Sequence, residues 1–91
     1  MNMVRKSKFI MFSNRLKLLY KLKEKNFYVR MHAYEYIVGT GDKMVAIILL
    51  EPNKNSVDIL KLKRSKGWEI KEIISTIKSL DPCVKIKTKS L

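Results

Sequence analysis

Alternate residues between 27 and 38 combine aromatic rings with a guanidinium and an imidazole, and side chains at alternate positions of a strand project to one face. These residues are Tyr28, Arg30, His32, Tyr34 and Tyr36. Rings of this kind stack on unpaired bases, at about 1–3 kcal/mol per base, so the three tyrosines are predicted base-stacking residues and Arg30 a nucleic-acid contact. The alternative interpretation is that the tyrosines pack beneath a helix, because tyrosine favours strands by propensity alone.

The C-terminal stretch 83–89 also alternates, with lysines at every second position. Lys85, Lys87 and Lys89 share one predicted strand face, and side chains of like parity lie about 6.6–6.8 Å apart. That spacing is close to the interval between phosphates, so the three ammonium groups are predicted to follow a nucleic-acid backbone. The same lysines would also protect an edge strand against pairing with another sheet.

A third basic cluster lies just before a predicted helix at 68–80. Its members are Lys61, Lys63, Arg64 and Lys66. The free amides of a helix's first turn carry partial positive charge, so we expect phosphate to bind there. Trp68, at the helix start, is predicted to be a core anchor rather than a stacking platform.

The N-terminal region supplies further cations. Residues 1–12 are predicted to form a basic arm, followed by a helix at 13–25. The candidate nucleic-acid contacts here are Arg5, Lys6, Lys8, Arg15, Lys17, Lys21 and Lys23. An anionic membrane is the disfavoured partner, because the leucines of this helix are needed to close a small core.

Catalysis has little support in the sequence. His32 is the only histidine and Cys83 the only cysteine, which excludes a disulfide within the chain and a Cys/His zinc site. No metal, cofactor or catalytic residue is therefore predicted. A metal-independent ribonuclease stays an alternative, with His32 and Tyr34 as an acid–base pair and Arg30 as a phosphate clamp.

The elements expected to position these residues form one α+β domain at 13–91. Strands are predicted at 27–38, 44–50, 57–63 and 83–89, the second following a glycine-containing turn at 39–42. The element order is therefore α-β-β-β-α-β, with two helices and an antiparallel sheet of three to four strands. A short helix remains the competing interpretation of 57–63.

Through the second helix this order resembles the double-stranded-RNA-binding domain, in which a three-stranded sheet carries both helices and lysines at the start of the second helix contact phosphate. The family opens that helix with a Lys-Lys-x-Ala-Lys run. Residues 63–68 occupy the same place without paired lysines and without an alanine-rich helix. The resemblance covers the order of elements, and the family is not assigned.

The overall composition favours a polyanionic partner. The formal charge is +12, which opposes a compact monomer through self-repulsion, while a hydrophobic fraction of 46% is typical of a folded domain. We therefore expect a non-catalytic RNA-binding protein, cytoplasmic, and of the kind found in ribosomes or other ribonucleoproteins, where further proteins would be neighbours. The main alternative is a DNA-binding protein of an archaeal or viral type.

Overall fold

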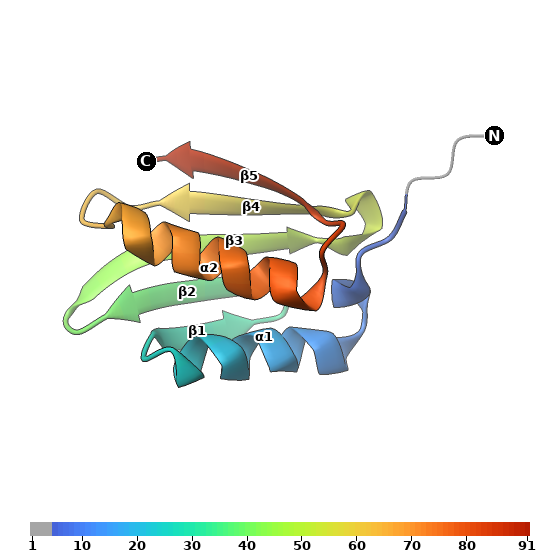
Figure 1. Ribbon diagram of the computed structural model, residues 1–91, viewed down its shortest axis with the longest axis horizontal. Coiled ribbons are helices and arrows are strands. Elements are labelled where there is room, and N and C mark those ends of the chain that lie inside the picture. Colours follow the sequence, from blue (N-terminus) through green and yellow to red (C-terminus); the bar gives the residue numbers. More distant parts are fainter. Residues whose placement is uncertain (1–4) are drawn as a thin grey trace.

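Within residues 5–91, which the computed structural model of the chain describes, two helices and five strands form a small α+β fold (Figure 1). The helices are α1 (Phe12–Glu24) and α2 (Gly67–Leu80), and two short 3₁₀ turns are η1 (Lys8–Ile10) and η2 (Pro52–Lys54). The strands are β1 (Tyr28–His32), β2 (Glu35–Thr40), β3 (Lys43–Glu51), β4 (Ser56–Lys61) and β5 (Lys85–Ser90). The predicted α+β class with two helices is confirmed.

The predicted sheet of three to four antiparallel strands is wrong. The sheet has the order β1-β2-β3-β4-β5, and its last pair, β4 with β5, is parallel. Parallel neighbours need a crossover, which α2 supplies. The segment expected at 57–63 does form a strand, β4, so the competing helix interpretation of that segment is wrong.

The fifth strand arises from a hairpin that the sequence did not predict. The expected single strand at 27–38 is interrupted by Ala33 and Tyr34, and His32 pairs directly with Glu35 across the turn. Ala33 has φ 55°, a left-handed conformation that usually requires glycine, asparagine or aspartate. The hairpin also places four strands between the helices, so the order departs from that of the double-stranded-RNA-binding domain.

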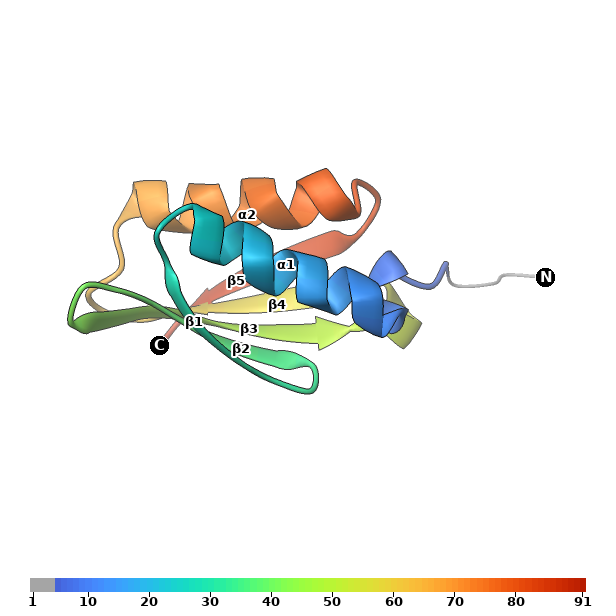
Figure 2. The same ribbon diagram turned by 90° about the horizontal axis from the view of Figure 1, so that it is seen from below.

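The core lies between the sheet and the two helices, which run side by side on one face (Figure 2). Leu18 and Leu22 of α1 and Ile73 and Ile77 of α2 are fully buried there. Hydrophobic burial of this kind is the main favourable term in folding. Among residues 5–91 neither helix has the length and apolar character to cross a membrane.

The N-terminal segment is part of the domain from Ser7 onward, which corrects the predicted arm at 1–12. Phe9 is fully buried in the core. The Ser7 hydroxyl donates to Asp81 Oδ2 at 2.6 Å, and the Ser7 amide donates to the carbonyl of Pro52 at 2.9 Å. The basic residues around Phe9 concealed this core position in the sequence. Residues 1–4 of the predicted arm lie outside the described residues.

Candidate nucleic-acid interface

The three C-terminal lysines form an exposed ridge on edge strand β5. Lys87 pairs with Asp58, whereas Ile86 and Thr88 pair with Val57 and Ile59, which are buried beneath the helices. The lysines therefore lie on the face of the sheet away from the helices. We call Lys85, Lys87 and Lys89 the β5 ridge; the shared face predicted for them is confirmed.

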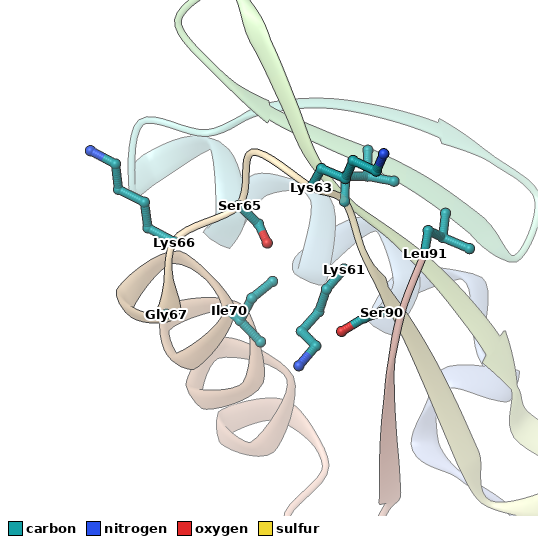
Figure 3. A pocket seen from close by; sticks show the side chains of 9 residues that line it. Lys61, Lys63, Ser65, Lys66, Gly67, Ile70, Ser90 and Leu91 are labelled. Carbon is teal, nitrogen blue, oxygen red and sulfur yellow. The ribbon is translucent and has the colours of Figure 1, made fainter.

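A cavity of about 380 Å³ lies at the end of the sheet where β4 and β5 finish and α2 begins (Figure 3). We call it the α2 cavity. Lys61 extends between α2 and β5 toward Ser90, and the Ser65 hydroxyl points toward the same space, whereas Lys66 extends away from it. Lys63 also belongs to the lining.

The predicted basic cluster before α2 is thus only partly assembled. Arg64 does not belong to the residues that line the α2 cavity. Its carbonyl instead accepts a hydrogen bond from Lys43 Nζ at 2.8 Å. Sequence reasoning missed the two serine hydroxyls, because Ser90 reaches the cavity only through the parallel pairing of Lys61 with Ser90.

The start of α2 is fixed by a buried carboxylate. Glu69, 1% exposed, accepts hydrogen bonds from the Lys66 amide at 2.7 Å and from the Thr40 hydroxyl at 2.9 Å. Lys43 Nζ lies 3.5 Å from Glu69 Oε1. Burial alone would raise the pKa of Glu69, but these hydrogen bonds and the Lys43 charge hold it below its ordinary value. The network joins the β2–β3 turn to the helix that borders the α2 cavity.

The candidate cations are not neutralised by acidic side chains of the fold. Among residues 5–91 the salt bridges involve only Lys25, Lys43 and Lys54, paired with Glu72, Glu69 and Glu51. None of these lysines is a candidate nucleic-acid contact. Asp58 lies beside Lys87 on the helix-free face, but the two do not form a salt bridge in this structure. The β5 ridge, on the helix-free face, and the lysines of the α2 cavity, on the helix side, lie at the same edge of the sheet, and we call them together the cationic surface.

Comparison of the chain with protein-family models, curated proteins and solved structures gave no match. Residues 5–91 contain no group of three His, Cys, Asp or Glu side chains placed to hold a metal ion.

The predicted row of rings is divided by the β1–β2 hairpin. Tyr28, Arg30 and His32 are exposed on the helix-free face of β1, the edge opposite the β5 ridge. Four strand spacings separate these edges, or about 19 Å. Tyr34 lies in the turn and is 42% exposed.

Tyr36 is fully buried, so its predicted role in base stacking is wrong. In the hairpin Glu35 shares the face of its partner His32, so Tyr36 projects to the other face, toward the helices. Its hydroxyl donates to the carbonyl of Arg15 at 2.8 Å. Burial raises the pKa of Tyr36, although the Arg15 charge opposes the shift.

Arg15 makes contacts within the fold, unlike the other cations of α1. Its Nη1 donates to the carbonyls of Phe9 and Ile10 at 2.8 and 3.0 Å. Its guanidinium lies 4.3 Å from the ring centroid of Tyr34 and 5.5 Å from that of Phe12. The remaining predicted contacts of this region are exposed to solvent: Arg5, Lys6, Lys8, Lys17, Lys21 and Lys23.

Trp68 is 60% exposed, so its predicted role as a core anchor is wrong. Ile70, Ile73 and Ile77 supply the buried stripe of α2 instead. An alanine methyl at neighbouring Gly67 would meet nothing within 4 Å, so Gly67 is not needed for close packing.

His32 faces a carboxylate on the adjacent strand. It pairs with Glu35 across the β1–β2 hairpin, and both border a cavity of about 350 Å³ that Arg30 also lines. Tyr34 is not part of that lining. The predicted trio of His32, Tyr34 and Arg30 is therefore not gathered at this cavity, which Glu35 lines instead of Tyr34.

Proposed function

We propose that this protein binds nucleic acid without catalysing a reaction, and that RNA is its preferred partner. The observation that carries the proposal is the cationic surface formed by the β5 ridge and the α2 cavity. Its lysines face solvent or the cavity, and within residues 5–91 none of them makes a salt bridge. When such a lysine, free of acidic partners, neutralises a phosphate, it releases a cation condensed on the nucleic acid. This release is a main source of nucleic-acid affinity.

The geometry of the ridge suits a phosphate backbone. Successive ridge lysines are about 6.6 Å apart along β5, and the ridge ends at Lys89, next to Ser90, which pairs with Lys61 on the helix side of the same edge. Contacts of this type position a nucleic acid without reading its sequence. Exposed Tyr28 and Tyr34 favour RNA, whose loops present unpaired bases that stack on aromatic rings.

Size and charge fit a component of a ribosome or another ribonucleoprotein, in which other proteins would be neighbours. A DNA duplex could use the same lysines, because phosphate contacts do not distinguish the two polymers. Competition between unlabelled RNA and DNA for one labelled RNA separates these alternatives. Preferential displacement by RNA supports the proposal, and preferential displacement by DNA refutes the RNA assignment.

The cationic surface is tested by changing Lys85, Lys87 and Lys89 together to Gln. Fluorescence anisotropy with a labelled RNA is measured over a range of salt concentrations. Removing three contacts to a single strand should reduce the slope of log affinity against log salt by about 2. Two single variants form a matched pair. Lys87→Gln should weaken RNA binding, and Lys71→Gln should weaken it less, because Lys71 is exposed on α2, in the helix layer. Equal effects from Lys87→Gln and Lys71→Gln would show that the ridge is not the binding surface.

The pairing of His32 with Glu35 favours one second candidate, a metal-independent ribonuclease. One of His32 and Glu35 would accept the proton of the attacking ribose 2′-hydroxyl, the other would donate a proton to the departing 5′-oxygen, and Arg30 would stabilise charge on the phosphate. Incubation with labelled RNA in the presence of a chelator tests this candidate. Cleavage that is lost in His32→Ala, with unchanged folding, would establish it; intact RNA would exclude it.

A further inference from the structure

A group of exposed apolar side chains lies at the opposite end of the molecule from the α2 cavity. Ile10, Met11 and Phe12 are consecutive and exposed, and Tyr34 joins them from the β1–β2 turn. Phe12 and Tyr34 both contact the guanidinium of Arg15, which is held in place by two backbone carbonyls. Two exposed rings therefore share one guanidinium, whose position is fixed by backbone carbonyls.

A cavity of about 320 Å³ lies beside Tyr34, which forms part of its wall. Its apolar lining comes from Ile10, Leu50 and Pro52. Polar groups are added by Glu51, Asn53 and Lys54, at the end of β3 and in η2. We call this the Tyr34 cavity. A flat heteroaromatic ring that needs both stacking area and a few hydrogen bonds matches such a lining.

We infer that the Tyr34 cavity receives an unpaired base of a bound single-stranded RNA, with Tyr34 as the stacking surface. This inference rests on the proposed function and adds a base site to it. The contact of Tyr34 with Arg15 restricts the ring before binding, so less side-chain freedom is lost when a base stacks on it. Asn53 and Glu51 can hydrogen-bond to a base edge, and Lys54 can approach a phosphate.

The position of the cavity agrees with the cationic surface. The row Glu51, Ser56, Lys85 crosses the sheet from β3 to β5 on the helix-free face. The β5 ridge therefore begins at the same end of the sheet as the Tyr34 cavity. Lys85 lies two strand spacings, about 10 Å, from the β3 residue that lines the cavity. A strand that follows the ridge can place a base near Tyr34.

An anionic membrane is the competing partner for exposed Ile10, Met11 and Phe12. Insertion of this end into a bilayer would bring Asn53 and the Glu51–Lys54 salt bridge toward the apolar phase, where polar and charged groups are costly to bury. A base can pair with those groups instead. The observations therefore favour the base over the lipid, and the experiment includes a membrane outcome.

The test compares a short single-stranded RNA with a blunt RNA duplex of equal phosphate number, using the full chain. Tyr34→Leu keeps an apolar side chain in the turn and removes the ring, whereas Tyr34→Phe keeps the ring. Tyr20→Leu is the matched control, because Tyr20 is an exposed tyrosine on α1 that does not line the cavity. Circular dichroism and thermal unfolding establish that each variant is folded.

We expect Tyr34→Leu to weaken single-strand binding about tenfold and duplex binding little. Tyr34→Phe and Tyr20→Leu should bind as the wild type does. A fluorescent base analogue in the single strand should be quenched by the wild type and much less by Tyr34→Leu.

Three results would overturn the inference, and they separate it from the proposed function. If Tyr34→Leu binds the single strand with wild-type affinity and the binding stays salt-dependent, the base site is wrong and the cationic surface stands. If the wild type binds neither RNA, both proposals fail. If phosphatidylserine vesicles bind the protein through Met11 and Phe12 while single-strand binding is unaffected by Tyr34→Leu, this end of the molecule is a membrane contact.

Discussion

Substitution of Glu69 by Gln is a stringent test of how the fold positions the α2 cavity. Glu69 accepts hydrogen bonds from Lys66 and Thr40, and Lys43 lies within 3.5 Å of the carboxylate. Gln keeps one acceptor oxygen, places an amide donor where the second acceptor was and removes the negative charge. Lys43 keeps its hydrogen bond to the carbonyl of Arg64, which limits the cost. We therefore expect a loss of about 2–3 kcal/mol in the free energy of unfolding.

The effect should depend on pH in a defined direction. The pKa of Glu69 is lower in the folded protein than in the unfolded chain, so its ionised form stabilises the fold. That contribution is complete above the unfolded pKa, about 4.5, and is lost as the pH falls through the folded pKa. The difference between wild type and Glu69→Gln should therefore be largest near neutral pH and shrink below about pH 4.5.

Thermal and urea unfolding at neutral and acidic pH measure both expectations. For a domain of this size, the loss at neutral pH corresponds to a decrease in Tm of about 10–20 °C. Equal stabilities at neutral pH would refute the account of the network, and so would a difference that does not shrink on acidification.

Other side chains make further predictions for the free energy of unfolding. Phe9→Ala should cost about 3–5 kcal/mol, because Phe9 is fully buried, whereas a residue in a flexible arm would cost almost nothing; urea unfolding distinguishes the two. Gly39→Ala should destabilise by about 1–3 kcal/mol, because the added methyl would lie 2.7 Å from the carbonyl oxygen of Lys43. Gly67→Ala is its matched control and should be neutral or stabilising by up to about 1 kcal/mol, since open space surrounds that position in α2. Equal Tm values for the two glycine variants would contradict the close approach at Gly39.

The features that could be predicted from the sequence are those governed by local period. The alternation of Lys85, Lys87 and Lys89 predicted that they share one strand face. The spacing of the isoleucines in α2 predicted one buried face of the helix. Both depend on neighbours within a few residues, which the sequence displays directly. Neither requires knowledge of how the strands pair.

The features that could not be predicted depend on contacts between distant residues. The β1–β2 hairpin places Ala33 at positive φ without a glycine, so no residue type marked the turn, and the error moved Tyr36 to the wrong face. Phe9 is buried through contacts such as that of neighbouring Ser7 with Asp81, far away in the sequence. The approach of Ser90 to Lys61 needed the parallel pairing of β5 with β4.

Salt dependence of RNA binding by the unmodified protein tests the central claim most directly. If about six to ten phosphates contact the cationic surface, affinity should fall by about 10³ to 10⁵-fold between about 50 and 200 mM salt. A log–log plot of affinity against salt that is flat, or the absence of any RNA binding at low ionic strength, would contradict the account.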